Sequence, residues 1–309
     1  MTVLRIGTRR STLARAQSEA VADRLRRVLG VTVELVPVLS DGDKNDAPLV
    51  EIGGQGVFVG AVRDRLAAGQ VDLVVHSLKD LPTADDDRVI LAAVPRRGDP
   101  RDALVARAGL TLGELPAGST VGTGSPRRAA QLRALGLGVE VVEIRGNVDT
   151  RLAKVASGAL DAVLLARAGL VRLGREDEIT ENLDPIQMLP APGQGALAVE
   201  VAATAAALGD DLRTALDDPD SRAAVTAERS LLRTLQAGCL APIGALADVG
   251  EGDDGPEMYL RAVVAAVDGS HLVRLSAAGE PEQADALGRM LAADLLAEGA
   301  GDLMQERAS

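Results

Sequence analysis

The sequence predicts an α/β protein in which two lobes of related topology are followed by a small α+β domain. The stretches "LRIGTRRS" at 4–11 and "STVGTGSPRR" at 119–128 both place an apolar run before a polar turn that opens a helical pattern. Each of these helical patterns is followed by an expected strand, and the two strands have similar sequences, "VELVPV" at 33–38 and "VEVVEI" at 139–144. Apolar runs that alternate with amphipathic helices are typical of parallel sheets covered on both faces. We therefore expect one parallel sheet in each lobe.

The ends of the expected helices carry recognisable signals. The first helical pattern stops at Gly30, while the second begins after Ser125, whose side chain suits an N-cap, with Pro126 in the first helical position. Gly136 suits the position just after this second helix. A third strand completes each lobe after a glycine, at 69–77 and at 158–166.

Two stretches rich in proline and glycine, 94–104 and 189–199, mark crossings between the lobes. Two crossings predict a hinged pair of lobes with a cleft between them. We expect lobe one at 1–95 with about 196–217, lobe two at 100–190, and a third domain at 218–309.

The third domain is expected to combine two helices with an antiparallel sheet. An amphipathic helix runs from about Ser221 to Gln236, and a final helix runs from about Pro281 to Glu298. A tight turn in "VDGSH" joins the last two of the strands between them. Those three strands are expected near 243–249, 257–267 and 271–277.

Composition excludes several classes of function. The net charge of -12 and the presence of only two aromatic residues, Phe58 and Tyr259, argue against nucleic-acid binding, because single-strand binders are basic and stack bases on aromatic rings. No apolar run approaches the roughly 18 residues of a membrane span. A single cysteine and the lack of a leader pattern favour the cytoplasm.

Arginines gather where predicted strands end or the following helices begin. Ligands of open α/β sheets bind at that edge, and helix N-termini favour anions. Arginine adds a fork that matches a carboxylate. A single such arginine is most simply a solvated surface residue, but the recurring set favours a site for a ligand with several negative groups. The set comprises Arg9, Arg10, Arg127, Arg128, Arg145, Arg151 and Arg167.

The stretch "VVHSLKDLP" at 74–82 is the sharpest local signal in the first lobe. A buried strand is expected to end at Ser77, with Lys79 and Asp80 following in a loop at the ligand edge of the sheet. An exposed Lys–Asp pair would be the ordinary alternative and would contribute little. His76 is expected to be a packed residue at the strand end, and His271 lies beside a turn in the third domain.

Cys239 is the only cysteine and follows the first helix of the third domain. It has no second thiol for a disulfide, so the residues alone leave two interpretations, a small core side chain or a point of attachment. A cysteine hydrolase is a weak alternative because no histidine lies near a candidate nucleophile. A two-lobed protein that only binds a small anion would explain the arginines, but it would not need this thiol.

Six stretches together resemble the porphobilinogen deaminase (hydroxymethylbilane synthase) family, and the resemblance extends from Arg5 through the final helix. It implies three domains, two of them similar to the lobes of type II periplasmic binding proteins. The stretches are "HSLKDLP", "VGTGSPRRAAQL", "IRGNVDTRL", "ARAGLVRLG", "LPAPGQGAL" and "AGCLAPIG".

The resemblance implies a transferase of tetrapyrrole (heme) biosynthesis. Members carry a dipyrromethane cofactor on a cysteine through a thioether, and Cys239 within "AGCLAPIG" matches that cysteine. Four porphobilinogen molecules are joined head to tail with loss of ammonia, and water releases hydroxymethylbilane. Each ring bears an acetate and a propionate, so the growing chain is a polyanion. The family also implies a small-molecule substrate, no nucleic acid or membrane partner, no metal, and a monomer.

The resemblance assigns roles position by position. Asp80 matches the catalytic aspartate, whose carboxylate contacts pyrrole N–H groups and stabilises the cation left by ammonia. Positions that match cofactor contacts are Lys79, Thr123, Ser125, Arg127, Arg128 and Arg145. Positions that match contacts to substrate or the growing chain are Arg9, Ser11, Phe58, Ser77, Arg151, Arg172 and Gln194.

The chain departs from the family pattern at four positions. Glu51 and Gln55 stand where lysines are expected in the 44–56 loop, which puts a lysine contribution to substrate capture in doubt. Gly124 stands where the pattern has serine, and Asp149 where it has glycine. None of these changes affects Cys239 or Asp80.

Overall fold

The computed structural model describes residues 3–38, 56–236, 242–253 and 255–305. The chain forms two compact units. The first contains Met1–Gly98 and Ala196–Arg222, and the second contains Asp99–Gly195 and Ala223–Ser309. Among the described residues, no helix combines the length and the apolar character that crossing a membrane requires.

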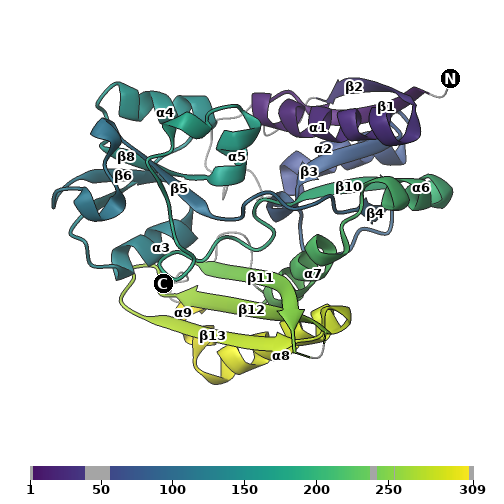
Figure 1. Ribbon diagram of the computed structural model, residues 1–309. Coiled ribbons are helices and arrows are strands. Elements are labelled where there is room, and N and C mark those ends of the chain that lie inside the picture. Colours follow the sequence, from purple (N-terminus) through teal and green to yellow (C-terminus); the bar gives the residue numbers. More distant parts are fainter. Residues whose placement is uncertain (1–2, 39–55, 237–241, 254, 306–309) are drawn as a thin grey trace. The chain divides into compact units, whose positions relative to one another are not determined.

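The first unit is built on a five-stranded sheet with the order β2-β1-β3-β10-β4 (Figure 1). Strand β1 pairs in parallel with β2 and β3, while β10 runs antiparallel to both β3 and β4. The strands are β1 (Val3–Arg9), β2 (Thr32–Val38), β3 (Leu73–Ser77), β4 (Val89–Ala93) and β10 (Leu197–Ala202). The helices are α1 (Thr12–Leu29), α2 (Gly56–Ala67), α6 (Ala206–Leu216) and the 3₁₀ turns η2 (Leu78–Asp80) and η6 (Ala203–Ala205).

The predicted end of α1 at Gly30 is confirmed, and the structure adds an N-cap at Ser11. The Ser11 hydroxyl accepts a hydrogen bond from the Ala14 N–H, and Gly30 ends the helix at φ 64°, a left-handed conformation that glycine adopts without strain. The buried face of α1, which includes Val21 and Leu25, packs on Ile6 and the other core residues of the sheet. Because β1 and β3 run in parallel, their carboxyl ends lie at the same edge of the sheet.

The second unit contains a sheet of related topology, with the order β7-β6-β8-β5-β9. Strand β6 pairs in parallel with β7 and β8, and β5 runs antiparallel to β8 and β9. The strands are β5 (Asp102–Ala106), β6 (Thr120–Thr123), β7 (Glu140–Glu143), β8 (Ala162–Ala166) and β9 (Glu181–Asn182). The helices are α3 (Pro126–Ala134), α4 (Val148–Ala156), α5 (Arg167–Arg172) and the 3₁₀ turns η3 (Arg107–Gly109), η4 (Leu112–Glu114) and η5 (Glu176–Glu178).

The expected parallel pairing is present in each sheet, but one strand of each sheet runs antiparallel to its neighbours, which the sequence did not predict. In the first sheet, the chain re-enters beside the end of β3, where Leu197 pairs with Ser77, so β10 can only run backwards along β3. In the second, Asp102 at the start of β5 pairs with Ala166 at the end of β8. The expected similarity of the two sheets is nevertheless confirmed, because both follow the same pattern of strand order and direction.

The remainder of the second unit is the predicted three-stranded antiparallel sheet with its helices (Figure 1). Its core gathers Leu231, Leu260 and Leu291 from helix and sheet alike. The strands are β11 (Ile243–Gly252), β12 (Gly255–Ala265) and β13 (Leu272–Gly279). The helices are α7 (Pro219–Thr234), the 3₁₀ turn η7 (Pro281–Gln283), α8 (Ala284–Ala297) and α9 (Ala300–Gln305), the last of which the sequence did not predict.

This small sheet packs closely against α3 of the same unit. Gly269 lies in the β12–β13 turn, and a Cβ atom added there would lie 2.7 Å from Cβ of Arg133. The Arg133 guanidinium donates to the Val267 carbonyl over 2.8 Å. The buried carboxylate of Glu228 on α7 accepts from the N–H groups of Gly193 and Ala247 at 2.5 and 2.8 Å. The 184–195 segment is therefore held between the two sheets of this unit.

Candidate functional site

The predicted Ser77–Asp80 segment lies at the carboxyl edge of the first sheet. Ser77 ends β3, and the next three residues form the single 3₁₀ turn η2 rather than the expected open loop. Leu78 is fully buried and donates its N–H to the Ala196 carbonyl at 3.0 Å. This anchor leaves Lys79 and Asp80 half-buried at the sheet edge. No described side chain forms a hydrogen bond or ion pair with the Asp80 carboxylate.

Two other predicted residues of the first unit lie at the end of β1. Arg9 is the last residue of the strand and is half-buried. Ser11 was expected to contact substrate, but its hydroxyl oxygen caps α1 by accepting from Ala14 N–H at 3.3 Å. That oxygen is therefore engaged within the fold, which leaves the hydroxyl proton as the group that Ser11 can offer.

The side chain that orients Ser77 was missed by sequence reasoning. Gln17 on α1 is buried, and its Nε2 donates to the Ser77 hydroxyl over 2.7 Å. Because the Ser77 oxygen accepts this bond, its proton is directed toward another acceptor. The sequence did contain one sign of this contact, because a glutamine on the apolar face of a predicted helix needs a buried hydrogen-bond partner.

A buried ionic group lies immediately behind this segment. Arg63 on α2 donates to both carboxylate oxygens of Glu200 on β10, at 2.6 and 2.9 Å. His76 Nε2 lies 3.4 Å from the same carboxylate and is buried, as predicted for a packed residue. Burial raises the pKa of Glu200, but His76 and Arg63 outweigh this effect and lower the pKa to about 2. The carboxylate is therefore ionised at neutral pH.

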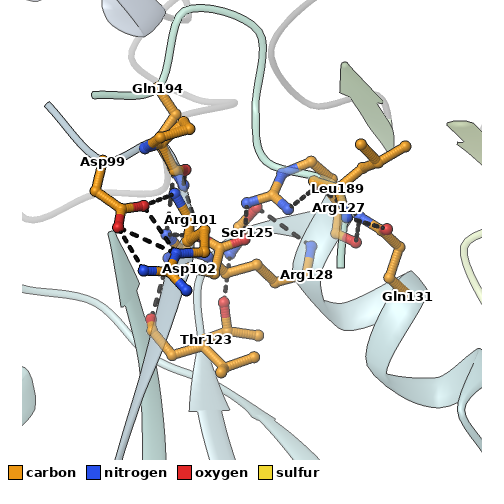
Figure 2. A network of polar contacts seen from close by, with 12 residues as sticks. Asp99, Arg101, Asp102, Thr123, Ser125, Arg127, Arg128, Gln131, Leu189 and Gln194 are labelled. Atoms are coloured by element: carbon orange, nitrogen blue, oxygen red, sulfur yellow. Dashed lines mark hydrogen bonds and ion pairs between the residues drawn. The ribbon is translucent and has the colours of Figure 1, made fainter. Parts of the chain in front are cut away.

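In the second unit, the side chains converge on Asp102 at the start of β5 (Figure 2). Its Oδ1 accepts from Arg128 Nε and Nη2 at 2.9 and 2.7 Å and from Gln194 Nε2 at 2.8 Å. Its Oδ2 lies 2.8 Å from Arg127 Nη2. Asp102 is fully buried, and although burial raises its pKa, the two arginines lower it to about 2. Sequence reasoning missed Asp102, a single acid that opens the apolar run "ALVA".

Arg127 and Arg128 therefore use much of their hydrogen-bonding capacity within the fold. Arg127 Nη1 donates to the Leu189 carbonyl over 2.5 Å, and Arg128 Nη1 donates to the Leu164 carbonyl over 3.0 Å. Their side chains are only 4% and 7% exposed. Burial lowers the pKa of Arg127. Both residues therefore contribute to the packed interior, and their contact with a cofactor stays a prediction.

Ser125 and Thr123 shape the turn that carries these arginines. The Ser125 hydroxyl accepts from Arg128 N–H at 3.4 Å, which confirms the predicted N-cap of α3, with Pro126 following it. The Thr123 hydroxyl accepts from Ser125 N–H at 3.2 Å. The turn is tight at Gly124, where an added Cβ would lie 2.6 Å from the Ile144 carbonyl oxygen. A residue with a Cβ atom would therefore clash with the backbone at this position, which explains the glycine.

Arg151 is a cation for which no described residue supplies a carboxylate at ion-pair distance. Its Nε donates to the Gly146 carbonyl over 2.9 Å, and its guanidinium group lies beside Gly124. Burial lowers its pKa, and the positive charges of Arg128 and Arg145 lower it further. Arg145 is more exposed and pairs with Glu143 over 2.9 Å. The charges around Arg151 thus favour an anion.

Arg172, at the end of α5, is a second desolvated cation. Its Nη2 donates to the Gly195 carbonyl over 2.6 Å, and burial lowers its pKa to about 10. In the described part of the chain, it has no carboxylate partner. Gln194, the residue before Gly195, is 1% exposed and donates to the Pro100 carbonyl as well as to Asp102.

The residues of the second unit fit a ligand with several carboxylates. Asp102 is one carboxylate between the guanidinium groups of Arg127 and Arg128, and Arg151 lies near enough to Arg128 for that charge to lower its pKa. A carboxylate brought to this cluster forms charge-assisted hydrogen bonds in a poorly solvated setting, where they are strongest. Among the described residues, no three His, Cys, Asp or Glu side chains are grouped as a metal site requires.

Four residues named from the sequence have side chains outside the described part of the structure. Phe58 lies in α2, where only its backbone is described. Cys239, Glu51 and Gln55 lie outside the described residues.

Comparison with known proteins links this arrangement to one family. The family model "Porphobilinogen deaminase, dipyromethane cofactor binding domain" matches residues 4–210, and "Porphobilinogen deaminase, C-terminal domain" matches residues 222–297. The chain is 58% identical to porphobilinogen deaminase from Nocardia farcinica, over 100% of this chain and 90% of that protein. It is 60% identical to porphobilinogen deaminase 1 from Streptomyces avermitilis, over 98% of both.

Among solved structures, a periplasmic substrate-binding protein of an ABC transporter from Coxiella burnetii is similar over 73% of this chain and 96% of its own. The identity is 13% and the TM-score is 0.45. The two family models together span most of the sequence. The chain therefore belongs to the porphobilinogen deaminase family.

Proposed function

We propose that this protein condenses four porphobilinogen molecules head to tail into hydroxymethylbilane, with release of ammonia, on a dipyrromethane joined to Cys239 by a thioether. One observation carries the proposal beyond family membership. Arg151 and Arg172 are desolvated cations without carboxylate partners among the described residues, which is costly unless an anion binds. A pyrrole chain with an acetate and a propionate on each ring is such an anion.

The residues of the second unit would hold these carboxylates. Arg145, Arg151 and Arg172 provide guanidinium groups that are not fully engaged within the fold. Arg127 and Arg128 add positive charge at the start of α3. Each charge-assisted hydrogen bond is expected to contribute about 1.5–3 kcal/mol to binding.

Asp80 would act on the reacting ring. Its carboxylate has no partner among the described side chains, so it can accept hydrogen bonds from pyrrole N–H groups. It can also stabilise the positive charge that develops as ammonia leaves. Ser77 presents its proton beside it, and Lys79 and Arg9 add positive charge at the same sheet edge. The bound dipyrromethane would supply the pyrrole carbon to which the first substrate is joined.

The mass of the denatured protein tests the proposal. Protein purified from cells with an intact tetrapyrrole pathway should exceed its sequence mass by two condensed pyrrole units, and Cys239→Ala should remove this excess. An unmodified mass for the unaltered protein would favour a protein that only binds an anion. The proposal includes a cytosolic, monomeric enzyme, since a chain with one cysteine suits a reducing compartment.

A further inference from the structure

We propose that Asp102 is the resident counter-ion of the carboxylate-binding site, a positioning residue that acts through Arg127, Arg128 and Gln194. The identity of the ligand in this inference rests on the proposed function. The role of Asp102 itself is argued from its contacts, all of which lie within the second unit.

The two carboxylate oxygens of Asp102 contact different arginines. Oδ1 accepts hydrogen bonds from both Nε and Nη2 of Arg128, so two donors of that guanidinium group converge on one oxygen. Oδ2 faces Arg127 Nη2, whose Nη1 donates to the Leu189 carbonyl. The same carboxylate therefore holds Arg128 by hydrogen bonds and Arg127 by an ion pair. Arg127 Nε remains buried and without a hydrogen-bond partner among the described residues.

Asp102 also connects the start of α3 with the 184–195 segment. Gln194 donates to Oδ1 over 2.8 Å and to the Pro100 carbonyl over 2.7 Å, so both contacts of its amide nitrogen are made at this end of the sheet. The next residue, Gly195, accepts the hydrogen bond of Arg172. The same carboxylate therefore indirectly positions the backbone that orients Arg172.

The charge balance gives Asp102 a second role. Among the described residues, it is the one carboxylate that forms ion pairs with Arg127 and Arg128, and the positive charge of Arg128 also lowers the pKa of Arg151. Asp102 neutralises part of this buried charge and leaves an excess for the ligand. Without it, the like charges would face one another in a poorly solvated interior, which is strongly unfavourable. Asp102 thus sets both the direction of the arginines and the amount of charge that a ligand must balance.

The test uses Asp102→Asn, which keeps the shape and removes the charge, in the full chain with Cys239→Ala, so that every sample lacks the cofactor. Asp99→Asn is the matched control. Asp99 is 20% exposed and pairs with Arg101 and Arg167, outside the Asp102 contacts. The probe is inorganic phosphate, and the readout is the melting temperature as phosphate is raised at constant ionic strength.

In low phosphate, Asp102→Asn should lower the melting temperature by about 10 °C, because it leaves buried guanidinium groups uncompensated. Phosphate should then raise the melting temperature of Asp102→Asn more steeply than that of Asp99→Asn. A residue with a merely structural role would lose stability without gaining this dependence on an anion. Equal phosphate dependence in the two variants would overturn the proposal.

A second variant decides the matter if Asp102→Asn does not fold. Asp102→Asn combined with Arg127→Met removes one charge of each sign, so it should fold and be more stable than Asp102→Asn alone. No recovery in the double variant would show that Asp102 is not the counter-ion of Arg127. Because no sample carries the cofactor, these outcomes are independent of whether Cys239 is modified. The mass measurement on the unaltered protein tests that separately.

Discussion

Arg172 donates a hydrogen bond from Nη2 to the Gly195 carbonyl over 2.6 Å, and no carboxylate of the described residues balances its charge. Burial lowers its pKa to about 10. Because folding disfavours the charged form, the free energy of unfolding at neutral pH is smaller than it would be with a neutral side chain. A desolvated cation kept at such a cost is expected where a ligand supplies the missing anion.

Arg172→Met should therefore separate stability from binding. In cofactor-free protein, it should raise the melting temperature, because an unbalanced cation is removed from a poorly solvated position. In protein with its cofactor, it should raise KM for porphobilinogen by about 10-fold or more, the loss of one charge-assisted hydrogen bond. Thermal unfolding and steady-state kinetics measure the two effects. A lower melting temperature with an unchanged KM would make Arg172 structural.

The arginines of the second unit should fall into two classes. Arg127→Met breaks a buried ion pair with Asp102, so it should lower the melting temperature by about 10 °C and impair cofactor assembly. Arg151→Leu breaks no ion pair of the described residues, so it should leave the melting temperature close to that of the unaltered protein. It should instead stall chain growth at covalent intermediates, which mass spectrometry of the denatured protein would reveal. Equal loss of stability in both variants would contradict this division.

Gly124 should tolerate no side chain. A Cβ atom there would lie 2.6 Å from the Ile144 carbonyl oxygen and 3.7 Å from Arg151 Nη2, so Gly124→Ala must displace the turn before α3. We expect a lower melting temperature and a smaller fraction of protein with the cofactor. Gly113→Ala is the control, because nothing lies within 4 Å of its added Cβ. Equal behaviour of the two variants would show that the turn can move at little cost.

The buried Glu200 carboxylate should contribute to the loss of folding stability at low pH. Its pKa is lowered from 4.5 to about 2 by folding, so it adds stability that is fully present above pH 4.5 and is lost as the pH falls toward 2. Glu200→Gln should be less stable at pH 7, because Arg63 loses its partner, and its stability should change less between pH 5 and pH 3. Denaturant unfolding across this range is the measurement. Parallel pH curves for both proteins would exclude this role.

Local signals made much of the fold predictable. Ser125 with Pro126 marked the start of α3, and Gly30 marked the end of α1. The similar sequences of the expected strands indicated two related sheets. These features depend on neighbours in the sequence. The antiparallel strands β5 and β10 were not predicted, because their direction depends on where the chain re-enters each sheet.

The site was predictable in its residue types but not in its pairings. The arginine set indicated an anion, yet Arg128 and Asp102 are 26 positions apart, and Gln17 and Ser77 are 60 apart. No periodicity reports such long-range contacts. Ser11 and Ser125 were assigned to ligand binding, although their oxygens also cap helices. A helix cap and a ligand contact use the same residue types, so the sequence alone does not separate them.

The most direct test is porphobilinogen consumption by cofactor-loaded protein with Asp80 unaltered, as Asp80→Asn and as Asp80→Glu, with cofactor content checked by mass. The unaltered protein should consume porphobilinogen and release ammonia. Asp80→Asn keeps the shape without the charge and should lose about 10²–10³-fold in turnover, the usual effect of removing one electrostatic group from a transition state. Asp80→Glu keeps the charge and should retain more activity. No consumption by the loaded, unaltered protein, or an Asn variant as active as the Glu variant, would contradict the account.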